Sequence, residues 1–296
     1  MWLFLFTHIM GVACLNFDFL ALIKYIFLGV VQGITEVLPV SSSGHVELIK
    51  NLLNLDVEGE VLFLILLNTG SLATFLIIYW RKLFTLIKSF VIYIFKPSKR
   101  YENYDNTVYL LKVLIACIPA GIAGIIIKPI LENFMGDYGV LLAGVGLLVT
   151  ATVIYWISTI RLSRKNTDIS WTDTIFIGLA QAVAIFPGIS RSGMTTSAAL
   201  KRGVGIKSAL DFSFLMYIFI SLAATFLLAF DLSESTGVME NIQYLYYFFA
   251  FIFTMFATYI AYRLIFNIFR TGKLRYFSYY CFAAGILSVL LYVVQI

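Results

Sequence analysis

The stretch that decides the fold lies near the N-terminus and reads Gly29-Val-Val-Gln32-Gly-Ile-Thr-Glu36-Val-Leu-Pro39-Val-Ser41-Ser42-Ser43-Gly44-His45. It combines a carboxylate, an amide, hydroxyls and an imidazole within strongly apolar surroundings. Because Gln32 and Glu36 are four residues apart, they project from one face of a helix. Pro39 disfavours the helical conformation of the residue before it, so the helix ends there. The stretch therefore predicts a broken helix with a polar site at the break.

The turn after the break has the composition of an anion-binding site. Ser41, Ser42, Ser43 and Gly44 are small residues whose backbone N–H groups can form a concave nest for an anion. They also open a second short helix, whose N-terminus carries a partial positive charge. We therefore expect Ser41, Ser43 and Gly44 to bind phosphate.

A second stretch repeats the first after a shift of 149 residues. It reads Gly178-Leu-Ala-Gln181-Ala-Val-Ala-Ile-Phe-Pro187-Gly-Ile-Ser190-Arg191-Ser192-Gly193-Met-Thr195-Thr196, and the shift superposes a Gly, a Gln, two Ser and a Gly of the two stretches. The segments that begin at Ser71 and Ser221 are related by nearly the same shift. We infer one integral membrane domain, 1–296, built of two repeats, about 17–160 and about 166–296, each opening with a broken helix pair.

The composition indicates a membrane protein. Hydrophobic residues make up 61% of the chain and charged residues 12%, with a mean hydropathy of +0.93, well beyond the apolar share of a soluble domain. The formal net charge of +5 belongs to loops beside an anionic leaflet, and no basic domain is present to bind nucleic acid. We therefore expect a polytopic protein surrounded by membrane lipids. Residues 1–16 form an apolar extension that is too short to span a bilayer.

Apolar segments and charged loops predict the topology. The basic loops around 81–100, 161–165, 201–207 and 263–275 are expected on the cytoplasmic side, and the acidic loop 231–240 on the outer side. Both termini then fall outside. The six full spans are expected at 61–80, 108–127, 138–158, 209–230, 244–265 and 276–294.

The two broken pairs are expected to be re-entrant. With three full spans in each half, the second repeat is inverted relative to the first, a design in which broken helices meet near the midplane. Non-helical backbone is tolerated at that depth only where it lines a cavity or is buried in protein. The alternative, one long kinked helix for each pair, reverses the loops between the pairs, against their charges. The predicted fold is therefore all-α, with six full transmembrane helices and two re-entrant broken-helix pairs.

Glu36 and His45 are the residues of the first stretch best suited to chemistry. A mid-helix acid costs roughly 2.5–3.5 kcal/mol on insertion scales, so its presence indicates a function. Glu36 is either a ligand for a divalent cation, with Gln32 beside it, or a carboxylate that holds and charges His45; otherwise it lies at the water interface. The imidazole of His45 changes protonation near neutral pH and suits acid/base or nucleophilic work, although a lone histidine is more often structural.

Arg191 is the strongest single feature of the second stretch. A guanidinium keeps its charge, so inside a membrane it must face an anion. Among hydroxyls and glycine amides it has the composition of a phosphate clamp that binds bidentately. The flanking candidates are Ser190, Ser192, Gly193 and Thr195. The alternative is that Arg191 only pairs with Glu36, and both arrangements hold in turn if phosphate enters the pair.

The two motifs resemble those of the undecaprenyl-diphosphate phosphatase family, the bacitracin-resistance type of bacterial membrane proteins. The resemblance covers nearly the whole chain from about residue 17 and rests on residues 32–45 and 187–195. It implies hydrolysis of a polyprenyl diphosphate lipid, undecaprenyl diphosphate, to the monophosphate at the outer face of the plasma membrane, with Mg or Ca. This reaction recycles the lipid carrier for cell-wall synthesis and gives bacitracin resistance. The family's first acidic position is Gln32 here, so Glu36 is the one carboxylate of the expected metal site. The roles that the resemblance implies fall on Glu36, Ser42, His45, Ser190, Arg191 and Thr195.

Two alternatives stay open at this point. The attacking group is His45, Ser42 or an activated water. The rival function is a transporter or flippase of a polyprenyl phosphate, since inverted repeats with broken helices are the usual build of alternating-access carriers. A carrier needs a clamp but no nucleophile, so His45 beside Ser42 and Glu36 favours an enzyme. The sequence leaves the oligomeric state open, a homodimer included.

Overall fold

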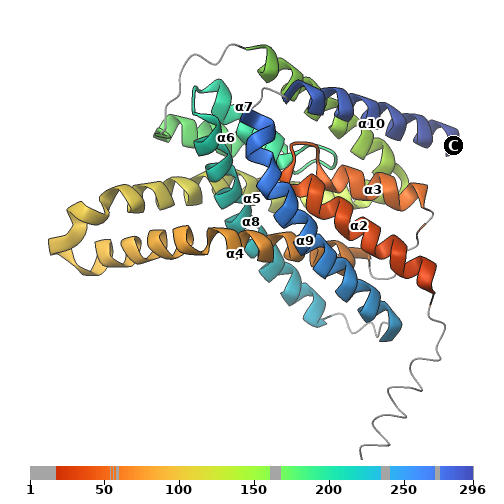
Figure 1. Ribbon diagram of the computed structural model, residues 1–296, viewed down its shortest axis with the longest axis horizontal. Helices are drawn as coiled ribbons and strands as arrows, with labels where there is room; N and C mark the ends of the chain where they lie inside the picture. Colours follow the sequence, from red (N-terminus) through yellow and green to blue (C-terminus); the bar gives the residue numbers. More distant parts are fainter. Residues whose placement is uncertain are drawn as a thin grey trace, which may run out of the picture.

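The computed structural model describes residues 18–53, 55, 57, 60–160, 168–234, 241–270 and 274–295. All regular structure in these ranges is helical, which confirms the all-α prediction (Figure 1). The extension 1–16 and the basic loop 161–165 lie outside the described residues. The helices are α2 (Phe19–Val37), α3 (Ser42–Leu52), α4 (Glu60–Phe95), the short η1 (Pro97–Lys99), α5 (Arg100–Thr159), α6 (Trp171–Val183), α7 (Arg191–Lys201), α8 (Ile206–Glu234), α9 (Asn241–Arg270) and α10 (Leu274–Gln295).

Each broken pair is an antiparallel helical hairpin. In the first, Lys24 Nζ near the start of α2 donates to the carbonyl of Leu53 at the end of α3, at 3.0 Å. In the second, Arg202 Nε after α7 donates to Asp173 Oδ1 at the start of α6, at 2.7 Å. The second arm of each pair therefore returns beside the first (Figure 1). This arrangement excludes one long kinked helix for either pair, while their placement within a membrane stays a prediction.

The shift of 149 residues recurs in these contacts. Lys24 and Asp173 are separated by that shift, and so are their partners Leu53 and Arg202. After each second arm, the N–H of Leu55 donates to the carbonyl of Lys50, and the N–H of Val204 donates to that of Ala199. The two hairpins are therefore built alike, down to the backbone bonds that end them. The inverted orientation of the two repeats stays a prediction.

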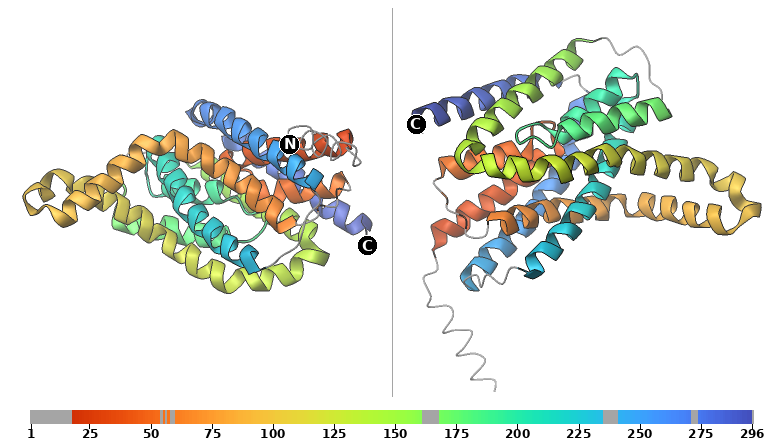
Figure 2. Two further views of the ribbon diagram at one scale, coloured as in Figure 1. Left: turned by 90° about the horizontal axis from the view of Figure 1, so that it is seen from below. Right: turned by 180° about the vertical axis from the view of Figure 1, so that it is seen from behind.

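Seven helical segments in the described part of the chain are long and apolar enough to cross a membrane. Six of them overlap the predicted spans, and the seventh is Phe19–Val37, the first arm of the first hairpin. Two predicted spans, 108–127 and 138–158, lie within the single helix α5, which folds back on itself sharply between them (Figure 2).

The basic segment 81–95 is not the loop that its charges suggested. It continues α4 to Phe95, and with the start of α5 it forms a long helical hairpin that projects from the rest of the molecule (Figure 2). The reason is that apolar residues keep a helical spacing there: Leu83 and Leu86 face the core, where Leu110 and Val113 of α5 are also buried. The positive charges lie on a helix and not on an irregular loop.

The first arm of each hairpin packs closely on a helix from the other half of the chain. A Cβ added to Gly29 would lie 2.4 Å from the carbonyl oxygen of Ala250 in α9, and one added to Gly178 would lie 2.6 Å from that of Ala116 in α5. Only glycine allows helix backbones to approach so closely, as at many helix crossings in membranes. The two halves therefore interlock, and each hairpin is held by helices of the other half.

Candidate functional site

The tips of the two hairpins meet at the centre of the molecule. Ser192 Oγ at the start of α7 donates to the carbonyl of Leu38 in the first tip, at 3.0 Å. A Cβ added to Gly44 would lie 3.0 Å from the Cα of Gly188 in the second tip. Gly188 has a φ of 81°, a left-handed conformation that favours glycine. The two motifs, 149 residues apart in sequence, are therefore neighbours.

Glu36 joins the residues of the two motifs. Its Oε2 accepts hydrogen bonds from Gln32 Nε2 at 2.8 Å and from Ser42 Oγ at 2.6 Å. Its Oε1 pairs with Arg191 Nη2 at 3.3 Å. The residue is only 9% exposed, so the ion pair and the two hydrogen bonds compensate a charge that burial would otherwise penalise. The pairing of Glu36 with Arg191, which the sequence left as one alternative, is present.

Arg191 is the first residue of α7 and is held from three sides. Besides Glu36, Nη1 donates to Ser221 Oγ at 3.2 Å, and Cζ lies 4.7 Å from the centroid of the Tyr217 ring. Its side chain is 29% exposed, against 6% for that of Glu36. The guanidinium is therefore the more open member of the pair.

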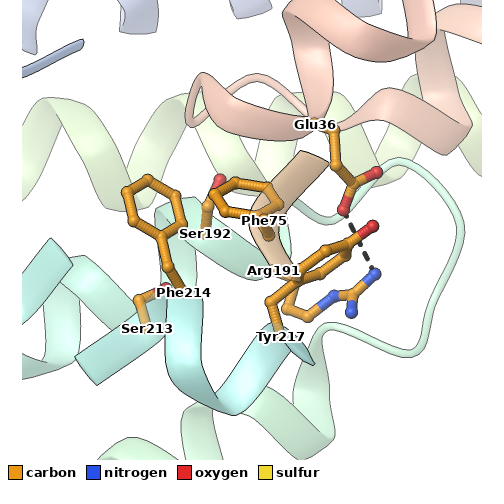
Figure 3. Close-up of a pocket in the computed structure, with 7 residues that line it drawn as sticks. All are labelled: Glu36, Phe75, Arg191, Ser192, Ser213, Phe214 and Tyr217. Atoms are coloured by element: carbon orange, nitrogen blue, oxygen red, sulfur yellow. Dashed lines mark hydrogen bonds and ion pairs between the residues drawn. The ribbon is translucent and has the colours of Figure 1, made fainter. Parts of the chain in front are cut away.

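A small pocket opens between the hairpin tips and helices α4 and α8. Figure 3 shows its polar side, where the carboxylate of Glu36 faces the guanidinium of Arg191, and its aromatic side, made by rings from α4 and α8. The lining residues are Glu36, Phe75, Arg191, Ser192, Ser213, Phe214 and Tyr217. A polar head group attached to an apolar chain matches this division.

The starts of α3 and α7 are capped in the same way. Ser41 Oγ accepts from the N–H of Gly44 at 3.3 Å, and Ser190 Oγ accepts from the N–H of Gly193 at 3.1 Å. Each cap hydroxyl also lies 3.4 Å from a second one, that of Ser43 or Ser192. Ser41 has a φ of 69°, which is uncommon for a residue with a side chain and often marks a functional turn. The N-termini of α3 and α7, which carry partial positive charge, therefore lie beside Glu36 and Arg191.

His45 and Thr195 have other partners. His45 is 3% exposed; its Nδ1 lies 2.7 Å from the carbonyl of Ser41, and its Nε2 lies 2.8 Å from the hydroxyl of Tyr280. Since a carbonyl only accepts, Nδ1 carries the proton. Thr195 is fully buried and bonds to the carbonyl of Arg191 at 2.9 Å and to Ser213 Oγ at 2.6 Å. The contacts of Glu36 therefore do not support the alternative in which it holds His45.

Comparison with known proteins gives the family. The family described as bacitracin resistance protein BacA matches residues 25–287. The chain belongs to the BacA family. It is similar to undecaprenyl-diphosphatase 3 of Bacillus anthracis, with 39% identity over 92% of this chain and 98% of the relative, and to undecaprenyl-diphosphatase 1 of Bacillus licheniformis, with 40% identity over 91% and 97%. An undecaprenyl-diphosphatase of Acholeplasma laidlawii is 35% identical over 92% of this chain and 98% of the relative.

The acidic motif of this BacA-family chain fits a divalent cation only together with a phosphate ligand. In the described part of the chain, no group of three His, Cys, Asp or Glu side chains lies close enough to hold a metal ion. Among the described residues that line the pocket, Glu36 is the one carboxylate, and the Gln32 amide and the Ser42 hydroxyl are bonded to it. Mg²⁺ is commonly held by one or two carboxylates together with substrate phosphates. These residues therefore fit a cation that a diphosphate brings with it.

The sequence did not single out the residues of α4 and α8 that contact Arg191 or line the pocket of this BacA-family protein. Phe75 of α4, Tyr217 of α8 and Ser221 of α8 surround Arg191 or line the pocket beside it. One sequence signal was available for α8, because Ser213, Tyr217 and Ser221 recur every four residues and so share one face of an apolar helix. Polar groups on one face of a membrane helix usually face the protein interior.

Proposed function

We propose that this protein hydrolyses undecaprenyl diphosphate to undecaprenyl phosphate and inorganic phosphate. Membership of the BacA family supports this, as do relatives of 35–40% identity that are named undecaprenyl-diphosphatases and are covered almost completely. The same names favour a phosphatase over a lipid carrier. The lipid monophosphate would return to cell-wall synthesis, and the description of the family as bacitracin resistance proteins agrees with this recycling.

One observation carries the proposal: Glu36, which lines the pocket, bonds to both Ser42 and Arg191. A carrier for phosphate lipids needs the guanidinium but has no use for a hydroxyl held 2.6 Å from a carboxylate. That contact is the geometry of an alcohol beside its general base. It supports Ser42 over His45 as the attacking group.

The proposed mechanism begins with the terminal phosphate between the helix starts. Arg191 and the N–H groups at the start of α7 bind its oxygens, and these charges matter most as the phosphoryl group transfers. Ser42 Oγ forms a bond to the terminal phosphorus while the bond from that phosphorus to the bridging oxygen breaks. The proton of Ser42 passes to Glu36, and undecaprenyl phosphate leaves. Water then forms a bond to the phosphorus of the phosphoserine while the bond from that phosphorus to Ser42 Oγ breaks; Glu36 returns its proton to Ser42 Oγ, and the protons of the water leave with the inorganic phosphate as H₂PO₄⁻.

Other residues support this chemistry from outside the pocket. His45 holds the carbonyl of Ser41 and thereby fixes the turn that carries Ser42. Ser190 caps α7 and receives its own support from α5, because its N–H donates to Thr150 Oγ1 at 2.8 Å. Thr195 fastens α7 to α8 through Ser213. We assign all three a positioning role.

A divalent cation, Mg or Ca, completes the proposed site. Glu36 would hold it, with Gln32 beside it and with oxygens of the diphosphate as the other ligands. The cation would neutralise charge on the transferred phosphoryl group. The site is proposed to face the outer side of the bacterial plasma membrane, which agrees with the expected topology.

Release of phosphate from undecaprenyl diphosphate by the full chain, purified in detergent, tests the proposal. We expect turnover by the unaltered protein and its loss in Ser42→Ala. Full activity of Ser42→Ala would exclude the serine mechanism. If the protein releases no phosphate but moves polyprenyl phosphate between the leaflets of a vesicle, the result would support the carrier function instead.

A further inference from the structure

Apart from Glu36, the partners that the described residues supply to the Arg191 side chain come from one face of α8. The guanidinium carbon lies 4.7 Å from the centroid of the Tyr217 ring, and Nη1 donates to Ser221 Oγ at 3.2 Å. Tyr217 and Ser221 are one helical turn apart and are 4% and 2% exposed. Figure 3 shows the Tyr217 ring beside the guanidinium, with its hydroxyl end next to the ion pair between Glu36 and Arg191.

The orientation of the Tyr217 ring is itself fixed from a third helix. Its hydroxyl donates to the side-chain Oδ1 of Asn68 in α4 at 2.8 Å and lies 3.1 Å from the carbonyl of the same residue. Its ring packs against that of Phe75 with 5.0 Å between centroids. The ring is therefore a fixed surface, held by α4, on which the guanidinium lies.

We propose that Tyr217 and Ser221 are positioning residues that orient Arg191 toward the phosphate of its substrate, an inference that rests on the proposed clamp role of Arg191. The face of an aromatic ring attracts a cation without occupying any of its N–H donors. Ser221 and Glu36 engage two of the five donors that a guanidinium carries. The ring thus holds the charge in place while leaving donors in the guanidinium plane for phosphate oxygens.

The ring also explains how Arg191 stays in position when the substrate enters. A phosphate that binds Arg191 competes with Glu36 for the same cation, so the pair with Glu36 weakens at that moment. The contact with Tyr217 is made by the face of the ring, which offers no oxygen acceptor in place of the phosphate, so it does not compete with the phosphate as Glu36 does. Without the ring, the released side chain would regain rotamer freedom, at a cost to phosphate binding.

The experiment compares aromatic and aliphatic residues at position 217 in the full chain, purified in detergent. We expect Tyr217→Phe to stay within about threefold of the unaltered kcat/KM, because it keeps the ring and loses only the hydrogen bonds of the hydroxyl. Tyr217→Leu and Tyr217→Met should lose about 30-fold in kcat/KM, the equivalent of about 2 kcal/mol for a desolvated cation–π contact. Inhibition by inorganic phosphate, measured as its Ki, should weaken in parallel.

Tyr262→Leu is the matched control, because Tyr262 packs against Phe75 and Phe214 but does not line the pocket. It should lower the melting temperature about as much as Tyr217→Leu while leaving the phosphate Ki unchanged. Ser221→Ala adds an independent test, because it removes one hydrogen bond to Arg191. We expect a loss of about tenfold or less in kcat/KM. In the Arg191→Lys background, Ser221→Ala should cause no further loss of kcat/KM.

The outcomes separate this inference from the proposed function. If Arg191→Lys abolishes turnover while Tyr217→Leu and Tyr217→Met keep the phosphate Ki of the unaltered protein, the positioning role is wrong and the clamp stands. Equal losses of phosphate affinity in Tyr217→Leu and Tyr262→Leu would reduce Tyr217 to a packing residue and also overturn the inference. An unaltered protein without phosphatase activity would instead remove the proposed function.

Discussion

At the scale of single residues, Glu36 explains why a membrane helix carries an acid. Its cost of roughly 2.5–3.5 kcal/mol at mid-helix is offset by bonds from Gln32 and Ser42 and by the ion pair with Arg191. Removing one partner leaves a buried charge uncompensated, which is usually worse than losing the pair. Substitutions in this cluster therefore need readouts for both folding and turnover.

Replacing Arg191 by Lys tests the clamp. An ammonium keeps the charge and can still pair with Glu36, but it lacks the planar fork that binds two phosphate oxygens. We expect kcat/KM for undecaprenyl diphosphate to fall about 100-fold or more, with a melting temperature close to that of the unaltered protein. Retention of most of the activity by the Lys variant would contradict the clamp.

The Ser42–Glu36 contact predicts non-additive losses. Ser42→Ala and Glu36→Gln should each lower kcat by about 10²–10⁴, and the double variant should be little worse than the poorer single one because the two groups perform one proton transfer. His45 acts through the Ser41 carbonyl, so the loss of kcat in His45→Ala should instead multiply with the loss in Ser42→Ala or in Glu36→Gln. Single-turnover measurements of phosphate release check this. If the losses of kcat in Ser42→Ala and Glu36→Gln multiply in the double variant, the two residues do not perform one proton transfer.

The sequence singled out the residues that meet around Glu36, but not all of their contacts. Glu36, Ser42 and Arg191 were identified because charge and hydroxyls in apolar helices are costly and must be explained. The contacts of His45 with Tyr280 and of Arg191 with Ser221 were not, since Tyr280 is 235 positions from His45 and Ser221 is 30 from Arg191. Spacing in the sequence reveals neighbours on one helix, whereas these pairs depend on how separate helices cross.

At the scale of elements, the two hairpins place the site. Each is a pair of short helices whose ends away from the tip are joined by a side-chain contact. The first helix of each pair packs through a glycine against a helix of the other half. The sequence predicted both pairs, because Pro39 and the Pro187-Gly188 dipeptide interrupt apolar helices there. The sequence did not predict that α4 continues to Phe95. The positive-inside rule places basic residues on the cytoplasmic side but does not say whether they are helical.

The glycine crossings predict sharp differences between similar substitutions. Gly29→Ala would place a methyl 2.4 Å from the Ala250 carbonyl oxygen, and Gly178→Ala would place one 2.6 Å from that of Ala116. Each should destabilise the protein by about 1–3 kcal/mol through overpacking, seen as a lower melting temperature in detergent. Gly121→Ala is the control, because nothing beyond its chain neighbours and the backbone of its own helix lies within 4 Å of the added Cβ, and it should be neutral or stabilising. Equal stability of all three variants would argue against the crossings.

The ion pair that closes the second hairpin predicts a pH dependence. Asp173 starts α6 outside the seven candidate spans. Burial raises the pKa of Asp173, but hydrogen bonds from Ser170 and Arg202 outweigh it and hold the pKa below its ordinary value. A carboxyl whose pKa is lowered by folding stabilises the protein above its unfolded pKa, near 4, and loses this as the pH falls through the folded value.

Asp173→Asn should therefore lower stability at pH 7 by about 1 kcal/mol, a modest figure because the Arg202 side chain is 42% exposed and screened by solvent. The difference from the unaltered protein should shrink as the pH falls below about 4. Melting curves of both proteins across pH 3–8 measure it. A difference that is constant over this range would rule out the carboxylate as its source.

At the scale of the whole molecule, one site arises from two similar halves because they differ at a few positions. The shift of 149 residues pairs Glu36 with Ile185 and Ser42 with Arg191. The first half thus supplies the carboxylate and the hydroxyl, and the second supplies the cation. The hairpin tips bring the complementary groups together at one pocket. Neither half holds the complete set.

The orientation of the whole molecule in its membrane is the last prediction. Contacts join segments that the charges assign to the cytoplasmic side: Lys82 Nζ lies 3.5 Å from Asp211 Oδ2, and Lys201 Nζ lies 4.3 Å from the Trp156 ring. These segments therefore share one end of the molecule, and the side of any one of them fixes the others. Positive residues favour the cytoplasmic side, which puts both termini outside.

Labelling of single cysteines decides the orientation. In a variant without Cys14, Cys117 and Cys281, we expect Lys99→Cys to resist an impermeant thiol reagent in intact cells and to react after permeabilisation. Ser235→Cys, in the acidic loop, should react in both cases. Reaction of Lys99→Cys in intact cells would show that the molecule has the opposite orientation, because the contacts at that end hold these basic segments on the same side of the membrane. The pocket would still lie near the middle of the span Ile206–Leu227, where Tyr217 meets Arg191, but the basic end of the molecule, and not the acidic one, would then face outward.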